Sequence, residues 1–412
     1  MGRLLPGFVL VSTLVASSAL AQPLSELDGV RSICRSGTDS AVAKARRARG
    51  AAGVSAARVL PNPTLVVEHQ RSLSGVTDRE TVLGVAVPLG IGGRRWLLQD
   101  VAQARHKQSN LEAAAGLFEA VLSFREAYVV AAVAQARVEV LSKNQTDLDA
   151  LTVALQKLAK GGEAAGYDQL RQSTSSRLHR HSLESARAAA ASTRAQLQAW
   201  LNQEVTLPAD AVSTLVSGPR PARSVVDTAE VQGLEAQARA DELEARAARR
   251  RAVPDVSLFG GYRVLAAGSA RGQGISLSLE VPVTLFDHGQ GEAVRASSDA
   301  ELARASADRL RRRQQAVARA SQASLALLES TLPDAQAASR DAVAIRQRAT
   351  QLYAAGEASI TELLEAFRVA EDAQLAELAL TEQVALTRLQ QMRASGSMFD
   401  PELDKQCLGD KK

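Results

Sequence analysis

Aromatic residues are scarce in this chain of 412 residues: they make up 3% of the sequence, although 46% of it is hydrophobic. Bulky aromatic side chains usually fill compact cores. Alanine, leucine and valine have to supply the buried surface instead. Such a composition indicates long helices that pack closely against one another. The length is sufficient for one large core or for more than one domain.

Long hydrophobic runs are missing beyond residue 21, so the rest of the chain contains no segment able to cross a membrane as a helix. Residues 1–21 carry Arg3, then an apolar stretch that ends in the small-residue pattern A-L-A. This is the pattern of a secretory signal peptide, so we expect an exported chain that begins at Gln22. A single membrane anchor is the alternative, but the apolar core is short for a spanning helix. No cysteine follows the cleavage site directly, and no lipid anchor is expected there.

Cysteine is almost absent, with Cys34 and Cys407 at opposite ends of the chain. Export to an oxidising compartment would permit a disulfide between them, and two free thiols are the alternative. The five histidines show no metal-ligand spacing, so no metal site is predicted. Their positions are His69, His106, His179, His181 and His288.

Enzyme motifs are missing as well. The glycine-rich stretches GIGGRR and GSARGQG lack the lysine and serine or threonine of a phosphate loop, and no nucleophile–histidine–acid signature occurs. We therefore expect neither an enzyme nor a cofactor. The net charge is +4, and the run RLRRRQQ at 309–315 suggests nucleic acid at first sight. A charge run on a helix is usually a solvated face, and an exported protein seldom meets nucleic acid, so no nucleic-acid partner is expected.

The chain contains an internal duplication. Pro88 and Pro282 each end a strand-like segment, and they lie 194 residues apart. Each is preceded by another short strand and an Ala/Arg-rich helical stretch, and each is followed by a glycine-containing turn and a long helical region. The predicted organisation is a signal peptide at 1–21, an N-terminal helix at 22–60, a β-hairpin at 61–89, a helical repeat at 90–206, a connector at 207–224, a helix at 225–252, a second β-hairpin at 253–284, a second helical repeat at 285–395 and a tail at 396–412.

The helical repeats show coiled-coil spacing. The leucines that alternate three and four residues apart are Leu141, Leu148, Leu151, Leu155 and Leu158. Between 93 and 160 the only interior glycine or proline is Gly116, which predicts one helix of roughly 100 Å at ~1.5 Å per residue. Pro333 predicts a break or kink in the corresponding second helix.

The four strand-like segments are two-faced. In the first hairpin, Leu83, Val85 and Val87 share one face and small residues lie on the other. In the second hairpin, one face carries the apolar residues Val256, Leu258, Tyr262 and Val264, and the other carries Ser257, Gly261 and Arg263. Segments of about 9–11 residues cross a bilayer when tilted, and one apolar and one polar face suit a barrel wall. Four strands cannot close a barrel, because open edges in lipid leave backbone groups unpaired. Three identical chains would supply 12 strands. The alternative is a water-soluble hairpin packed on the helices.

Several motifs then resemble one family. They are LPNPTLVVE and VPLGIGGRR in the first half, and VPVTLFDHGQG in the second. A Tyr353-Ala-Ala-Gly356 turn is followed by Leu363-Leu364-Glu365-Ala366, and LAKGGEAAGYDQL is a weaker copy in the first half. The mature chain resembles the TolC family of trimeric outer-membrane efflux channels, and most of all its heavy-metal, CzcC-like branch. His288-Gly289 stands where that branch usually has Arg-Asn.

The resemblance implies a mixed α+β fold in which four transmembrane strands per chain contribute to a 12-stranded β-barrel, above a periplasmic α-barrel of long coiled-coil helices. It further implies a homotrimer in outer-membrane lipid of a Gram-negative bacterium, with a periplasmic adaptor and an inner-membrane RND pump as partners. The implied function is a passive exit duct, for divalent heavy-metal cations. A duct for drugs or for type I protein secretion is the alternative within the class, and a soluble periplasmic coiled-coil scaffold is the alternative outside it.

The resemblance also implies site residues. The gate and adaptor-contact tips would comprise Leu158, Gly161, Gly162, Glu163, Tyr353, Gly356, Glu357, Ala358 and Ser359. Glu362 and Glu365 match an acidic constriction, where three chains would place six carboxylates around one axis, attract cations and raise the pKa values of the carboxyls. Two solvated surface glutamates are the alternative. Ala358 stands where the family often has an arginine latch, so a different latch or a looser gate is expected.

Overall fold

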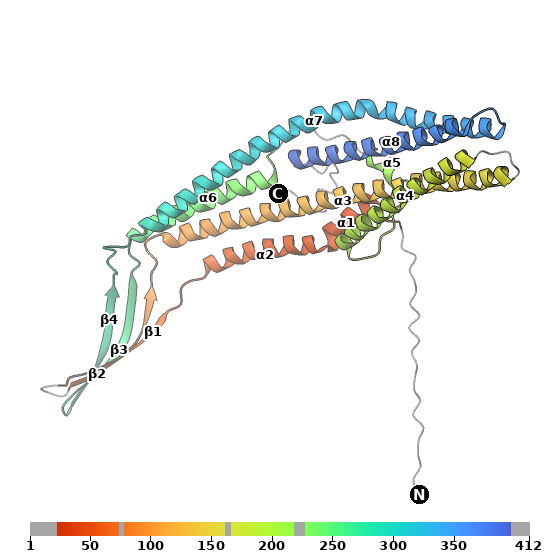
Figure 1. Ribbon diagram of the computed structural model, residues 1–412. Helices are drawn as coiled ribbons and strands as arrows, with labels where there is room; N and C mark the ends of the chain where they lie inside the picture. The colour runs from red at the N-terminus through yellow and green to blue at the C-terminus, as the bar shows by residue number, and fades with distance from the viewer. Residues whose placement is uncertain (1–22, 74–77, 161–165, 218–226, 397–412) are drawn as a thin grey trace, which may run out of the picture.

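The protein is an elongated, curved molecule with a β-sheet at one end and helical tips at the other (Figure 1). The computed structural model describes residues 23–73, 78–160, 166–217 and 227–396. The elements are α1 Glu26–Ser36, α2 Thr38–Arg58, β1 Thr64–Arg71, β2 Asp78–Pro88, α3 Arg94–Lys160, α4 Gly166–Leu201, α5 Ala211–Leu215, α6 Ala229–Arg249, the short 3-10 helix η1 Arg250–Ala252, β3 Ser257–Ala267, β4 Ala270–Glu280, α7 Gln290–Ala354 and α8 Ile360–Ser395.

Two helical hairpins of nearly equal size dominate the molecule. Helices α3 and α7 have 67 and 65 residues, and α4 and α8 have 36 residues each. The predicted fold class, long helices with four strands, is therefore confirmed. No helix among the described residues has the length and apolar character needed to cross a membrane.

The four strands form one antiparallel sheet in the order β1-β2-β3-β4. The two hairpins, far apart in sequence, are joined where β2 pairs with β3, with Leu83 opposite Tyr262 and Val87 opposite Leu258. Strands β1 and β4 are the outer strands of this sheet, and each is paired on one side within the described chain.

The main core lies in the middle of the molecule, around α3. Phe124 and Tyr128 are almost fully buried there, with their ring centroids 6.3 Å apart. The Tyr128 hydroxyl donates to the Leu24 carbonyl at 3.2 Å, and burial raises the pKa of Tyr128 to about 12. Gly29 of α1 allows the close approach, because a Cβ there would lie 2.1 Å from the Phe124 ring. The few aromatic residues are thus used where several helices meet.

The coiled-coil leucines pack as predicted. Leu148, Leu151 and Leu155 of α3 form a cluster with Ile360, Leu363 and Phe367 of α8, and Leu141 packs with Leu183 of α4. The side chain of Leu158 lies outside the described part of the chain.

Of the predicted break or kink at Pro333, the break does not occur, since α7 continues through this residue from Gln290 to Ala354. A kink stays a prediction. Figure 1 shows α7 as one continuous arc. Proline removes one backbone hydrogen bond from the helix. Buried residues lie on both sides of it, Leu325 before and Ala342 and Arg346 after, so packing holds both parts of the helix against its neighbours.

Candidate functional site

The first candidate surface is one face of the sheet. The strand register places large apolar side chains of all four strands on this face, and every one of them is exposed, from 42% for Val85 to 80% for Ile275. We call this set the apolar sheet face; it consists of Leu65, Val67, Leu83, Val85, Val87, Leu258, Tyr262, Val264, Ile275, Leu277 and Leu279. Val256, expected on this face, precedes β3 and is buried instead. A contiguous exposed apolar surface of this kind indicates a site of contact with a membrane or with another protein.

The opposite face of the sheet is mainly polar or small. Glu80 and Arg263 form an ion pair across it at 3.5 Å, and Ser276 and Ser278 of β4 lie on the same face. Phe259 and Leu265 are the large exceptions. The Phe259 ring occupies the space above Gly84 and Gly261, where added Cβ atoms would lie 2.5 Å and 2.7 Å from it. The two glycines therefore let an aromatic ring lie flat against the strands.

The turn after the sheet explains the VPVTLFDHGQG motif. Gly289 has φ of +84°, and a Cβ there would lie 2.1 Å from the Ala248 carbonyl oxygen. The Asp287 side chain accepts from the Gly289 amide at 3.0 Å, and the Gln290 side chain donates to the Phe286 carbonyl at 3.0 Å. Glycine and asparagine both tolerate the left-handed conformation, but the contact with the Ala248 carbonyl leaves no room for a Cβ, so this turn as folded requires glycine.

The second candidate site is the tip between α7 and α8. Gly356, with φ of +75°, ends α7 in a Schellman arrangement: its amide donates to Tyr353 at 3.1 Å, and the Glu357 amide donates to Leu352 at 2.9 Å. Ser359 then caps α8, because its hydroxyl accepts from the Glu362 amide at 3.3 Å. The Glu362 carboxylate accepts in return from the Ser359 amide at 2.7 Å. The sharp reversal thus follows from local hydrogen bonds.

The two predicted constriction carboxylates are exposed and already engaged within the chain. Hydrogen bonds from the Ser359 backbone and side chain lower the pKa of Glu362. A hydrogen bond from Arg368, at 2.6 Å, and its positive charge lower the pKa of Glu365. In the single protomer each carboxylate has a nearby donor, so both pKa values lie below their ordinary value. The expected rise concerns three chains around one axis and stays a prediction. A ring of carboxylates requires further copies of the chain and stays a prediction.

The structure brings several of the predicted tip residues together. Tyr353, Gly356 and Ala358 line a groove of about 940 Å³ between α3 and the α7–α8 tip. Leu151 and Asp147 of α3 line its other side. The predicted tip residues Gly161, Gly162 and Glu163 lie outside the described residues.

A buried polar layer behind this tip was missed by the sequence analysis. His179 of α4 is 8% exposed, and its Nδ1 lies 3.0 Å from a carboxylate oxygen of Glu371 in α8. Its Nε2 lies 2.9 Å from the Leu141 carbonyl oxygen of α3. Both neighbours are acceptors, so the protonated ring, which carries hydrogens on both nitrogens, satisfies both contacts. Burial alone lowers the pKa of His179, but the hydrogen bonds to Glu371 and Leu141 and the charges of Glu371 and Asp149 together raise it.

The same layer continues to α7. The Asn144 amide donates to Glu371 at 3.2 Å, and the Arg346 guanidinium donates to Asn144 and lies 3.6 Å from Asp147. Arg346 is 5% exposed and also stacks on Phe367, 5.5 Å from the ring centroid. Four helices therefore meet in one charged layer. No sequence signal pointed to it, because its members are spread from 141 to 371.

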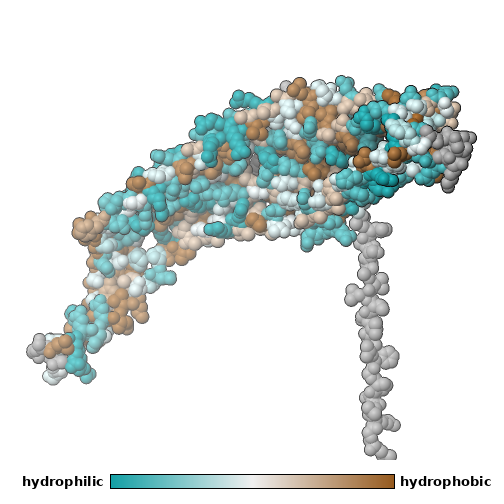
Figure 2. All heavy atoms as spheres, viewed as in Figure 1, coloured by the Kyte–Doolittle hydropathy of each residue, from teal (hydrophilic) through white to brown (hydrophobic). Residues whose placement is uncertain are grey.

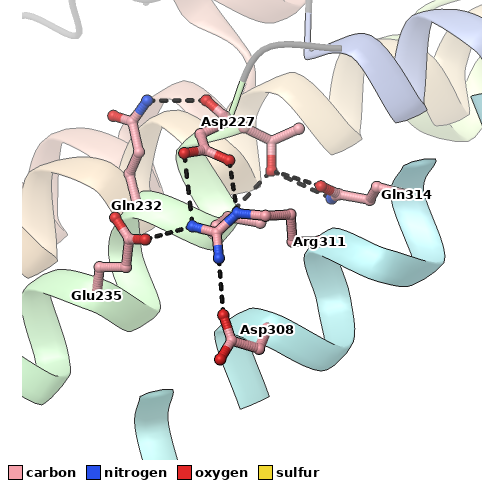
Figure 3. A network of polar contacts seen from close by, with 8 residues as sticks. Asp227, Gln232, Glu235, Asp308, Arg311 and Gln314 are labelled. Carbon is pink, nitrogen blue, oxygen red and sulfur yellow. Dashed lines mark hydrogen bonds and ion pairs between the residues drawn. The ribbon is translucent and has the colours of Figure 1, made fainter. Parts of the chain in front are cut away.

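A second polar network holds the start of α6 against α7 (Figure 3). Arg311 of α7 pairs with Asp227 at 2.9 Å, with Asp308 at 2.8 Å and with Glu235. The neighbouring helix cap, Thr228, accepts from the Gln314 side chain at 3.1 Å. The arginine run that suggested nucleic acid thus contributes one member to the internal structure.

The remaining predicted residues are placed as follows. Cys34 is buried in the main core and is not a free thiol, whereas Cys407 lies outside the described residues, so the pairing stays a prediction. Residues 1–21, predicted to be a signal peptide, also lie outside them. Within the described ranges, no group of three or more histidine, cysteine, aspartate or glutamate side chains is arranged to hold a metal ion.

Comparisons with known proteins agree on the architecture. No family model matches the sequence, and no curated protein matches it. Among solved structures, CmeC, an outer-membrane channel of Campylobacter jejuni, is 12% identical, with a TM-score of 0.74 over 96% of this chain and 93% of that chain. CusC, whose structures were solved to follow folding and transmembrane channel formation, is 15% identical, with a TM-score of 0.71 over 92% of this chain and 93% of that chain. The outer-membrane protein VceC of Vibrio cholerae is 15% identical, with a TM-score of 0.70 over 91% of this chain and 97% of that chain. At these identities the likeness concerns the fold alone, and the chain has the fold of an outer-membrane channel protein.

Proposed function

We propose that three copies of this chain form a channel through the outer membrane that serves as the passive exit duct of a tripartite efflux system. The observation that carries the proposal is the apolar sheet face, with its large side chains directed outward and exposed. Such a surface is favourable against lipid and unfavourable in water. The fold that the chain shares with CmeC, CusC and VceC supports the same reading.

The sheet has the geometry needed to close with copies of itself. β1 runs away from the helices, and β4 returns toward them, because every neighbouring pair in the sheet is antiparallel. The β4 strand of one copy would therefore meet the β1 strand of the next in an antiparallel pair. Closure satisfies the backbone groups at both edges, which lipid cannot do. Three copies give 12 strands with the face of Glu80 and Arg263 toward the lumen.

The helices would continue the duct into the periplasm. α3, α4, α7 and α8 of each copy would form its wall, and their tips would contact a periplasmic adaptor and the inner-membrane RND pump. In this arrangement Tyr353, Gly356 and Ala358 belong to the tip contact, and Glu362 and Glu365 line the constriction. The sequence resemblance supports these roles.

Divalent heavy-metal cations are the proposed cargo. The resemblance of VPVTLFDHGQG to the heavy-metal branch and the two exposed tip carboxylates support this cargo. Drugs, or secreted proteins, are the second candidate cargo, since the solved channels that share the fold do not by themselves select a substrate.

Single-channel recording of the full-length protein in a planar bilayer tests the duct. We expect stable, cation-selective conductance and a trimeric mass in detergent. A matched pair of variants tests the constriction: Glu362→Gln with Glu365→Gln should lower cation selectivity, whereas Glu301→Gln, an exposed carboxylate of α7, should not. Glutamine retains the helix-capping role of Glu362. The absence of any conductance would favour the soluble scaffold, and an unchanged reversal potential in the double variant would remove the acidic constriction.

Growth of a deletion strain tests the cargo. Sensitivity to Co²⁺, Zn²⁺, Cd²⁺, Ni²⁺ or Cu²⁺, restored by the intact gene, would support metal efflux. Sensitivity to dyes and antibiotics alone would support the efflux duct but would contradict metal cations as its cargo.

A further inference from the structure

The charged layer behind the tips concentrates ionisable groups that the fold buries. It consists of His179, Glu371, Asn144 and Arg346, which come from α4, α8, α3 and α7. Figure 2 shows hydrophilic residues distributed over the visible face of the helices, so charge is common outside. Inside, the described residues include only three buried histidine, lysine, arginine, aspartate or glutamate side chains, and two of them, His179 and Arg346, belong to this layer. Burial of charge is costly unless partners compensate it, so the layer requires a physical explanation.

The contact between α7 and the first helical hairpin does not depend on pH. The Arg346 guanidinium donates to the side-chain oxygen of Asn144 and lies 3.6 Å from Asp147, and both partners belong to α3. An arginine side chain stays charged at every physiological pH. This contact therefore holds α7 against α3 in acid and in alkali alike.

The contact between α8 and the first helical hairpin includes a group that titrates. Glu371 of α8 accepts from the Asn144 amide at 3.2 Å, and a carboxylate oxygen of it lies 3.0 Å from Nδ1 of His179 in α4. Nε2 of the same ring lies 2.9 Å from the Leu141 carbonyl oxygen of α3. One imidazole ring thus joins three helices.

The number of hydrogen bonds in this contact depends on one proton. A protonated ring donates to both Glu371 and Leu141, whereas a neutral ring has a single N–H and donates to one of them. The other nitrogen then directs its lone pair at an acceptor oxygen about 3 Å away, which is repulsive. Loss of the proton therefore removes one bond and also the attraction between two opposite charges.

The carboxylates around the ring favour the bound proton. Glu371 faces the ring from α8 and Asp149 from α3, where Gln145 and Ser176 donate to Asp149 at 2.8 Å and 3.1 Å. Burial lowers the pKa of His179, but its hydrogen bonds and these two charges together raise it above the ordinary value. The positively charged or ionisable neighbours lie toward other groups: Arg180 toward Asp149, Arg346 toward Asp147, and Arg137 and His181 along a groove.

This groove gives protons access to the buried pair. It has a volume of about 440 Å³ and is lined by Arg137 and Leu141 of α3, His181 of α4, and Glu371 of α8. The Glu371 side chain is 21% exposed. A proton therefore reaches the His179–Glu371 contact from the groove without separation of the helices.

We propose that the His179–Glu371 contact is a pH-dependent switch: the protonated ring holds α8 against α3 and α4, and the neutral ring releases α8 while Arg346 keeps α7 in place. The inference rests on the proposed channel. Glu365 and Glu362 precede Glu371 by six and nine residues on the same helix, which is about 9 Å and 14 Å at ~1.5 Å per residue. Movement of α8 at Glu371 therefore displaces the proposed constriction, and we expect the channel to conduct more when His179 is neutral.

Single-channel recording across pH tests the switch. The full-length protein is recorded in a planar bilayer with the same buffer on both sides, between pH 5.5 and pH 9. We expect conductance to rise about twofold or more through a transition above pH 6.5, the ordinary pKa of histidine. His179→Gln should give the high conductance at every pH, because glutamine binds no proton. His181→Gln, an exposed histidine on the same helix, should retain the transition.

The position of the transition distinguishes a titrating pair from a merely structural one. Glu371→Gln removes the negative charge beside His179 and should shift the midpoint to lower pH by about one unit or more. Asp372→Asn is the matched control, since Asp372 is the next residue on α8 and pairs with Arg368 at 2.8 Å. An unmoved midpoint in Glu371→Gln would overturn the inference.

Amide hydrogen exchange tests the release of α8 directly. Protection factors, which correct for the chemical effect of pH, are compared at pH 6 and pH 9 for residues 368–374 of α8 and 343–349 of α7. Protection of the α8 segment should fall about threefold or more at pH 9 and should be low at both pH values in His179→Gln. The α7 segment should keep its protection. Equal losses in both segments, or none in α8, would contradict a selective release.

The possible failures of this inference and of the proposed channel are distinguishable. Stable conductance that does not change with pH would overturn the switch and leave the channel in place. A transition that persists in His179→Gln but disappears in Glu362→Gln with Glu365→Gln would assign the titration to the tip carboxylates and also overturn the switch. Absence of conductance at every pH would remove the proposed function, and amide exchange would then still decide whether His179 holds α8.

Discussion

The two helical hairpins of the molecule have nearly the same dimensions but different surroundings. α3 contacts helices α1, α2, α4, α5, α6 and α8, whereas α7 is covered mainly by α6 and α8. The buried positions of α3 include large side chains such as Leu122, Phe124 and Tyr128, but the first half of α7 buries alanines, from Ala293 to Ala307. Figure 1 shows α3 running through the middle of the molecule and α7 along its side.

This difference shows that duplication of a hairpin need not duplicate its role. The outer side of α7 exposes Leu302 (67%) and Leu327 (70%), and it has room for a neighbour. α3 supplies the core of the protomer, and α7 supplies a flank. In the proposed trimer that flank is available for contact with the next copy.

The largest expected effect breaks the core of the first hairpin. Phe124→Ala should lower the free energy of unfolding by about 3–5 kcal/mol, because it removes a fully buried aromatic side chain and leaves a cavity. Leu327→Ala on the exposed side of α7 should change it by less than about 0.5 kcal/mol. Chemical denaturation of the detergent-solubilised protein, followed by helical circular dichroism, measures both. Similar losses in the two variants would contradict the distinction between core and flank.

The next effect concerns proline. α7 accommodates Pro333, and Glu139 is an exposed residue at a similar distance along α3. Glu139→Pro should cost about 3 kcal/mol, because α3 is confined on several sides and cannot bend to relieve the clash. Amide exchange along 133–141 should accelerate. Glu139→Ala serves as the control, and a proline variant with unchanged exchange would show that α3 bends as easily as α7.

A smaller effect appears in the layer that links the hairpins. The pKa of His179 is raised above its ordinary value of 6.5, so the bonded imidazolium stabilises the fold below that pH, and the contribution is lost as pH rises through the raised pKa. His179→Gln should therefore lower the free energy of unfolding more at pH 6 than at pH 9. The expected loss at pH 6 is about 1.5–3 kcal/mol, which is typical of a hydrogen bond to a charged group. His181→Gln, an exposed neighbour, should show no such dependence. A pH-independent difference would mean that His179 is neutral.

The smallest effect on stability is expected at the tip between α7 and α8. Ser359→Ala removes the helix cap and should cost about 1 kcal/mol, whereas Ser359→Asn should retain most of it. Amide exchange at Glu362 and Leu363 measures the loss. If the two variants exchange equally fast, the reciprocal hydrogen bonds with Glu362 do not stabilise the turn.

The sequence allowed the regular parts of this fold to be predicted. The leucine spacing from Leu141 to Leu155 reports a buried seam, and the alternation around Leu83 and Leu258 reports two-faced strands, because both depend only on local periodicity. Pro333 does not end the helix, since tertiary packing on both sides of it outweighs the lost hydrogen bond. The hydrogen bonds of Glu362 with Ser359 and of Glu365 with Arg368, which lower both pKa values in the protomer, were not foreseen from the sequence. The layer of His179, Asn144, Arg346 and Glu371 was invisible, as only the fold brings these residues together.

The open edges of β1 and β4 have a consequence for biogenesis. A newly exported protomer would expose two strand edges with unpaired backbone groups and, at the same time, the apolar sheet face. Both features promote aggregation. Its survival would depend on how quickly it finds its partners or a holdase in transit. Assembly of the channel should therefore slow steeply when the protein is diluted. A cell that makes little of the protein would lose a larger fraction of its protomers to aggregation before they assemble.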